Sequence, residues 1–170
     1  MHKPDSLLLH YDQGLRLLRW QWRGPISSAQ FQAAFYYLLE KSDQERVRRW
    51  LVDTSSMPVV GIDEQAWLSD TWLPLFVRLQ VTDVAIILPN NMHNQLVIEN
   101  VLADGQRYEC GDIQFFSDAT SALDWLTNSS GRGLELEQEW SEQHGADSEK
   151  YNNVTGPKNS VSWEGVPDTF

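Results

Sequence analysis

The sequence predicts a single α/β domain with a mixed sheet of four to five strands and helices packed against it. Residues 1–128 alternate between strand-like and helix-like segments, and only a short turn separates the first two strands. Two strands joined in this way form an antiparallel hairpin, whereas strands separated by helices pair in parallel through right-handed crossovers. With 170 residues, of which 41% are hydrophobic, the chain can bury one core without metal or disulfide support.

The hairpin is expected at residues 7–11 and 15–24, with the sequence Asp-Gln-Gly in the turn. In its second strand apolar residues alternate with polar ones, namely Leu18, Trp20 and Trp22 with Arg19, Gln21 and Arg23. Successive side chains of a strand point to opposite faces of the sheet. One face of this strand therefore belongs to the core, and the other is expected to meet solvent or a partner.

The remaining elements follow in β-α order. Ser27 and Gln30 suit a capping box that opens the first helix, and acidic residues from Asp63 favour the start of the second. Pro74 lies inside that second helix and cannot donate a backbone hydrogen bond, so a kink or break is predicted there. The expected helices are 27–44, 63–79, 90–102 and 119–126, and the expected strands are 48–54, 81–89 and 112–117.

The charge and the cysteine content limit the classes of partner and compartment. A formal charge of -11 repels phosphate backbones and anionic headgroups, so neither nucleic acid nor a membrane surface is expected as a partner. No apolar run approaches the ~20 residues of a membrane span. Cys110 is the only cysteine, and the first residues lack the apolar core of a signal peptide, so a cytoplasmic location is expected.

The composition changes at residue 129. Residues 129–170 contain 3 basic and 8 acidic residues and few aliphatic ones. Such a segment buries too little apolar surface to offset its ordering entropy, which predicts a mostly disordered acidic tail with, at most, a short helix near 134–143. Its tryptophans, Trp140 and Trp163, are interpreted mainly as incidental exposed aromatics, and the alternative is that they contact a partner or the domain's own surface. Deletion of residues 129–170 is accordingly predicted to leave the domain, residues 1–128, folded.

Three segments of residues 5–128 resemble the STAS domain family, which includes anti-sigma-factor antagonists and the cytoplasmic tails of sulfate transporters. They are the opening hairpin followed by a helix, the "WLVDTSSM" strand and turn, and the closing "FFSDATSALDWL". The resemblance implies a non-enzymatic regulatory domain, in bacteria, that binds a protein partner or itself.

The phosphorylation switch of that family is the feature in which this sequence departs from it. In the family a strand ends in aspartate, and an Asp-Ser pair later opens the next helix and takes the phosphate on its serine. Asp53 matches the first aspartate, and Asp63 fits the second if the loop is two residues longer, which places Glu64 at the serine position. Without an insertion Ile62 falls there. Neither side chain accepts a phosphate, and Glu64 is expected mainly to complement the helix dipole.

Ligands of open α/β sheets bind beyond the carboxyl ends of the parallel strands. The polar residues expected there form the candidate binding loops: Asp53, Thr54, Ser55, Asp63, Glu64, Asn90, Asn91 and His93. The alternative, which we weigh more heavily, is that they cap helices and satisfy loop amides. The histidines and the lone cysteine show no metal-ligand spacing, and no glycine-rich phosphate loop occurs, so neither metal nor cofactor is expected.

Bulky aromatic residues suggest an interaction surface. Six such residues are more than so small a core encloses readily: Trp20, Trp22, Tyr36, Tyr37, Trp67 and Trp72. The four tryptophans among them are the candidate interface residues, although core packing remains the leading explanation for any single one. The leading functional hypothesis is therefore a protein-interaction domain. The alternative is a module that binds a small apolar ligand or lipid, which an enclosed cavity of at least ~300 Å³ would support. An enzyme that uses Asp53 and His93 is a third hypothesis, which requires their side chains to meet.

Overall fold

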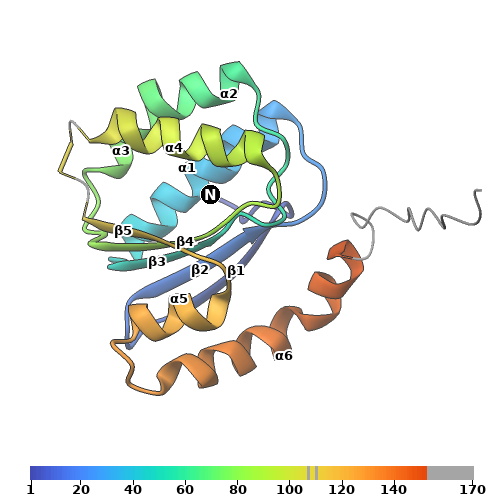
Figure 1. The fold of residues 1–170 in the computed structure, drawn as a ribbon, viewed down its shortest axis with the longest axis vertical. Coiled ribbons are helices and arrows are strands. Elements are labelled where there is room, and N and C mark those ends of the chain that lie inside the picture. Colours follow the sequence, from blue (N-terminus) through green and yellow to red (C-terminus); the bar gives the residue numbers. More distant parts are fainter. Residues whose placement is uncertain (107, 110, 153–170) are drawn as a thin grey trace, which may run out of the picture.

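The computed structural model describes residues 1–106, 108–109 and 111–152. Within them a five-stranded sheet lies between two layers of helices (Figure 1), which confirms the predicted fold class. The strands are β1 (Leu7–Asp12), β2 (Leu17–Trp22), β3 (Arg49–Asp53), β4 (Asp83–Ile87) and β5 (Asp112–Phe116). The helices are α1 (Ser28–Gln44), α2 (Ile62–Trp67), α3 (Leu73–Phe76), α4 (Met92–Gly105), α5 (Ala119–Leu126) and α6 (Arg132–Asn152), and a π-helical segment, η1 (Leu68–Trp72), joins α2 to α3.

The strands follow one another across the sheet in the order β1-β2-β3-β4-β5. The β1–β2 pair is the predicted antiparallel hairpin, and all later pairs are parallel. Because β2 to β5 run in the same direction, their carboxyl ends share one edge of the sheet. We call this the carboxyl edge.

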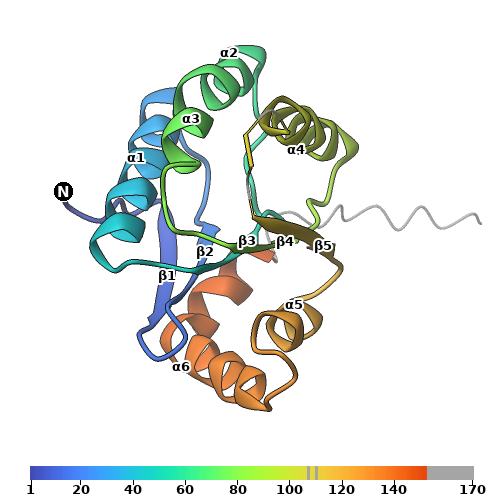
Figure 2. The same cartoon turned by 90° about the vertical axis from the view of Figure 1, so that its left-hand side faces the viewer.

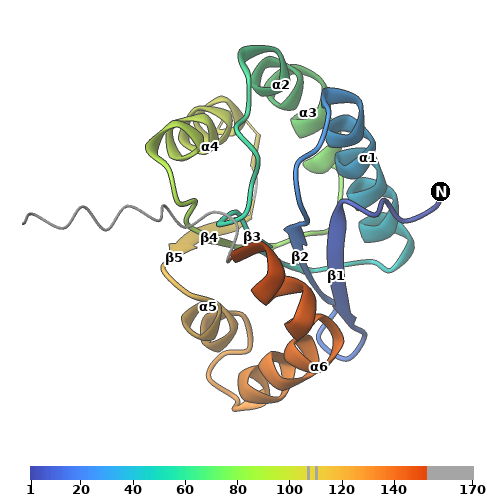
Figure 3. The same cartoon turned by 90° about the vertical axis from the view of Figure 1, so that its right-hand side faces the viewer.

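The two faces of the sheet carry different helices. Helices α1 to α4 cover one face, and α5 and α6 cover the other (Figures 2 and 3). Side chains alternate accordingly along each inner strand: Trp50 and Val52 of β3 pack in the core under α1 to α4, while Leu51 packs in the core of α5 and α6. The alternation of side chains along these strands therefore places residues in two cores, one on each face of the sheet, rather than in one.

The predicted break at Pro74 is confirmed, and it takes the form of a π-helical turn. The backbone N–H of Leu73 bonds to the carbonyl of Leu68, five residues earlier. Pro74 lies in the first turn of α3, where its missing N–H is tolerated best. The wider turn brings Leu68 and Leu73 to the same buried face, which a regular helix would not do for residues five apart.

The prediction of a disordered tail is wrong for residues 132–152, which form α6. The predicted short helix lies inside it. Trp140, expected to be exposed, is 5% exposed, and Leu136 is 2% exposed in the core beneath α5. Composition misled here because two apolar side chains, four residues apart, are enough to place a polar helix against a core. Residues 153–170, with Trp163, lie outside the described residues.

Helix α6 also covers the polar face of β2, which the sequence assigned to solvent or a partner. Arg19 and Gln21 are 5% and 8% exposed. The guanidinium of Arg19 lies 4.1 Å from the centre of the Trp140 ring, and its Nη1 donates to Oε1 of Glu137 at 2.5 Å. A cation–π contact and a charged hydrogen bond thus replace the water that Arg19 would otherwise bind.

The contact between α6 and β1 is expected to weaken in acid. Burial lowers the pKa of His10, although Glu139, 3.1 Å away, raises it. The folded chain therefore binds this proton less tightly than the unfolded chain does. The stability that neutral His10 contributes is complete above its ordinary pKa of 6.5 and falls as the pH drops below it.

We expect the melting temperature to be lower at about pH 5.5 than at about pH 7.5, as measured by circular dichroism. His10→Gln is expected to reduce this difference, whereas His2→Gln, in the exposed N-terminal segment, is expected to leave it unchanged. A His10→Gln chain that keeps the whole difference would refute the role of His10.

Candidate functional site

The polar side chains at the ends of β3 and β4 meet at the carboxyl edge, as the sequence predicted, but they bind the backbone of the loops. Oδ1 of Asp53 accepts hydrogen bonds from the amide and the hydroxyl of Ser55, at 2.9 and 2.5 Å. The Thr54 hydroxyl, which is buried, donates to the carbonyl of Ile87. Asn90 Nδ2 donates to the Ser55 carbonyl at 2.9 Å. The more heavily weighed alternative, loop stabilisation, therefore describes these four residues.

The first turn of α4 holds the loop between β3 and α2 in the same way. Asn91 is the N-cap, and its side chain accepts from the Asn94 amide at 2.8 Å. Nε2 of His93 lies 2.7 Å from the Val60 carbonyl. Asn94, which is 0% exposed, accepts from the Val60 amide at 3.1 Å and donates to the carbonyls of Met57 and Pro58 at 3.2 and 3.1 Å.

Asn94 is the residue that the sequence analysis missed. It falls at the buried face of α4, where an apolar side chain is the usual choice and where asparagine has low helix propensity. An asparagine at an apolar position of a helix is the signal that could have identified it. Its three hydrogen bonds fix the course of residues 57–60.

Asp63 and Glu64 lie in the first turn of α2, as predicted. The hydroxyl of Ser28, in the first turn of α1, donates to the Glu64 carboxylate. This hydrogen bond is the main cause of the lowered pKa of Glu64. Glu64 therefore links the starts of two helices in addition to its position at a helix N-terminus.

Asp53 and His93 each bond to a neighbouring loop. The Asp53 carboxylate is bonded to Ser55 and the His93 ring to Val60, and no hydrogen bond or ion pair joins the two in the part of the chain that the structure describes. Among the same residues, no group of three or more His, Cys, Asp or Glu side chains is placed to hold a metal ion.

Three of the four candidate interface tryptophans lie in the core, as the core-packing alternative expects, and are not available at the surface. Trp20, Trp22 and Trp72 are 2%, 1% and 6% exposed, and the half-buried Trp67 packs edge-on against Phe31. Edge-to-face packing lets the rings fill the core between the sheet and the helices α1 to α4.

Aliphatic side chains are exposed at the carboxyl edge instead. Val59 in the β3–α2 connection is 76% exposed and Ile62, the first residue of α2, is 84% exposed. Met92 and Leu96 on α4 are 73% and 54% exposed. The hydrogen bonds from Asn94 to residues 57–60 place the two segments side by side, as Figure 1 shows. We call these four residues the carboxyl-edge patch.

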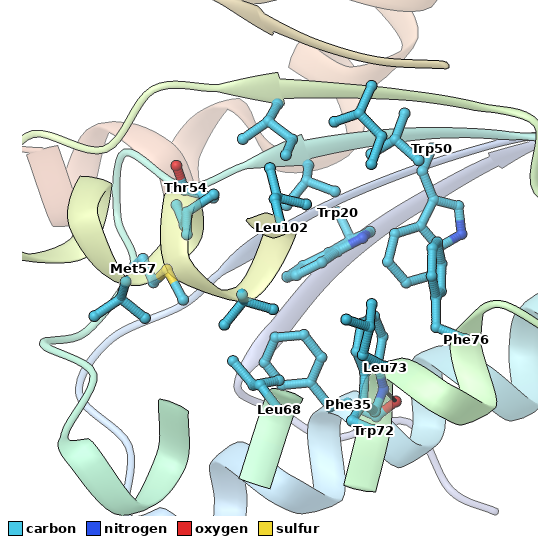
Figure 4. Close-up of a pocket in the computed structure, with 17 residues that line it drawn as sticks. Trp20, Phe35, Trp50, Thr54, Met57, Leu68, Trp72, Leu73, Phe76 and Leu102 are labelled. Atoms are coloured by element: carbon cyan, nitrogen blue, oxygen red, sulfur yellow. Dashed lines mark hydrogen bonds between the residues drawn. The ribbon is translucent and has the colours of Figure 1, made fainter. Parts of the chain in front are cut away.

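An apolar cavity of about 110 Å³ lies between the sheet and the helices α1 to α4. Leu68, Trp72 and Leu73, which the π-helical turn orients, form part of its wall, with Trp20 and Trp50 from the sheet (Figure 4). Thr54 also lines the cavity, but its hydroxyl donates a hydrogen bond to the carbonyl of Ile87 and points away from the other labelled side chains (Figure 4). The cavity therefore offers an occupant only apolar contacts.

Comparison with known proteins gives no relative. No family model, no curated protein and no solved structure matches the chain. Among the described residues, no helix has the length and apolar character needed to cross a membrane. The function is therefore argued from the two features that the site presents, the carboxyl-edge patch and the apolar cavity.

Proposed function

We propose that this chain is a non-enzymatic interaction domain that binds a protein partner through the carboxyl-edge patch. The observation that carries this proposal is that polar and apolar side chains at the carboxyl edge have different surroundings. The polar side chains bond to the loop backbone, and the apolar side chains between them face solvent. A surface that is ordered before binding loses little conformational entropy when a partner docks.

The chemistry of the patch defines the partner. Ile62 and Val59 supply an apolar centre, and the carboxylates of Asp63 and Glu64 follow directly in α2. The chain as a whole carries a charge of -11. A partner with an apolar pocket and a basic rim fits this surface, and its association should slow as salt screens the charges.

The resemblance to STAS domains supports the same proposal. It would make this chain a cytoplasmic, bacterial regulator that lacks the family's phosphorylated serine, because Glu64 or Ile62 stands in that position. A permanently exposed apolar patch beside a fixed carboxylate suits binding that does not depend on phosphorylation at this helix start. Neither metal nor cofactor has a part in this proposal.

Replacing Ile62 with glutamate tests the patch. Because Ile62 is 84% exposed, Ile62→Glu should change the free energy of unfolding by no more than about 0.5 kcal/mol. It should weaken binding of the partner at least about tenfold, since a charge then has to be desolvated at the apolar centre. Partners are first captured from extract on the immobilised wild-type chain and on the immobilised Ile62→Glu chain. The affinity of a purified partner for each chain is then measured by calorimetry.

Leu134→Glu is the matched control, because Leu134 is an equally exposed aliphatic residue (72%) on α6, away from the patch. It should retain the partner. The proposal fails if Ile62→Glu captures the same proteins with the same affinity, or if native mass spectrometry of the wild-type chain in extract shows only an unbound monomer.

The apolar cavity supports a second candidate function, the binding of a small apolar molecule. At about 110 Å³ this cavity is well below the ~300 Å³ of a conventional ligand site, so a lipid does not fit inside it. Apolar cavities of about 150 Å³ do bind benzene. A single small ring or a short alkyl group is therefore the class of ligand that this space can take.

Benzene is the probe for this second candidate. If it enters the cavity, it should raise the melting temperature of the wild-type chain in a concentration-dependent way, because only the folded state binds it. Val97→Phe places a ring in the same space and should abolish the effect of benzene. No shift in the wild-type chain at saturating benzene would exclude this candidate.

A further inference from the structure

The contacts that hold α6 on the sheet are mainly polar and charged. Besides the Arg19–Glu137 pair, Arg132 Nη2 lies 2.6 Å from Asp12 Oδ2, and His144 Nε2 lies 2.9 Å from the Leu9 carbonyl. Each of these pairs joins residues more than 115 positions apart in the chain. With charged contacts around only two buried apolar side chains, Leu136 and Trp140, the contact resembles an interface between proteins more than a domain core.

The connection between α5 and α6 is short and strained. It consists of residues 127–131, and three of them, Asn128, Ser129 and Gly131, have φ values of 52°, 55° and 82°. Left-handed backbone costs about 1 kcal/mol or more for a residue such as serine, whereas asparagine adopts it more readily. If this connection straightens, the strain at Ser129 is released, and α6 moves away from the sheet of its own chain.

A chain that has released α6 exposes a surface that fits another α6. Arg19 then lacks Glu137 and the Trp140 ring, and the released helix carries both groups unpaired. We propose that α6 exchanges between two copies of this chain, so that each α6 docks on the β1–β2 face of the other copy. The contacts of α6 with the sheet are reproduced in the exchanged dimer, and only the hydrogen bonds within the connection are lost as it straightens.

Charge reversal at the Arg19–Glu137 pair tests the exchange. Arg19→Glu and Glu137→Arg each place like charges together, both in a closed monomer and in a dimer of identical chains. In a dimer of one chain of each kind, one interface has the original pair and the other has the reversed pair. The two variants, unfolded and refolded together, should form a one-to-one dimer of two 19.6 kDa chains at least about tenfold more readily than either variant alone.

The chain that carries both substitutions should refold to the same assembly state as the wild-type chain, which shows that the reversed pair is tolerated. Sedimentation velocity and native mass spectrometry measure the assemblies. If the refolded mixture contains only monomers while this doubly substituted chain folds, the exchange is refuted.

Shortening the connection gives a test that leaves the contacts between α6 and the sheet intact. Deletion of Ser129 and Ser130 removes two of the five residues between α5 and α6, so that α6 cannot turn back on its own sheet. The shortened chain should be a dimer at micromolar concentration, and a folded monomer with α6 docked would overturn the proposal. Ile62→Glu, added to the shortened chain, should leave this dimer unchanged, which separates the exchange from binding at the carboxyl-edge patch.

Discussion

Deletion of residues 129–170 is expected to lower the melting temperature of the domain by about 15 °C, the reverse of what its composition predicts. The deletion removes Leu136 and Trp140, which are 2% and 5% exposed, and uncovers Leu123 of α5. Removing a buried leucine or tryptophan side chain costs about 2–5 kcal/mol each. A loss of about 5 kcal/mol is a large part of the 5–15 kcal/mol that stabilises a typical domain, and each kcal/mol corresponds to about 2–4 °C at this size.

The matched control is deletion of residues 153–170 alone, which retains the whole of α6. Its melting temperature should stay within a few degrees of that of the full chain. Urea denaturation of the three chains measures the same difference as a free energy of unfolding. If the chain that ends at residue 128 is as stable as the full chain, α6 does not contribute to the core as the structure indicates.

Element order could be predicted from the sequence because it depends on local signals. The hairpin turn, the capping box at Ser27, the acidic first turn at Asp63 and the break at Pro74 all involve residues close together in the chain. The burial of Arg19 could not be predicted in this way. Its partners, Glu137 and Trp140, are more than a hundred residues away, and an arginine on a strand normally indicates a face in contact with water.

At the candidate site, too, local signals could be predicted from the sequence and contacts between distant residues could not. The sequence placed Asp53, Ser55, Asn90 and His93 together at the carboxyl edge, because parallel strands bring their ends to one place. What each side chain binds there depends on where the backbone of residues 57–60 runs, and no local pattern predicts that course. The exposed aliphatic residues of the patch were overlooked for a related reason, since a single exposed valine or methionine carries no signal until folding brings several together.

Asn94→Ala is expected to be the most damaging single substitution at the carboxyl edge, with a loss of about 3 kcal/mol in the free energy of unfolding. It leaves the Val60 amide and the carbonyls of Met57 and Pro58 without their partner, in a place where the Asn94 side chain is fully buried. Each unsatisfied buried backbone group costs about 1–3 kcal/mol, although movement of the loop lets water replace part of the loss. Urea denaturation measures the change.

Asn90→Ala serves as the control, because it removes one hydrogen bond, to the Ser55 carbonyl, from an exposed position. It should cost no more than about 1 kcal/mol. The two variants also separate the scaffold from the surface it supports. Asn94→Ala frees residues 57–60 and so disorders Val59, which should weaken partner binding even under conditions in which the variant is still folded. Asn90→Ala should not weaken it. If Asn94→Ala binds the partner with wild-type affinity while it is folded, the rigidity of this loop is not what prepares the patch for binding.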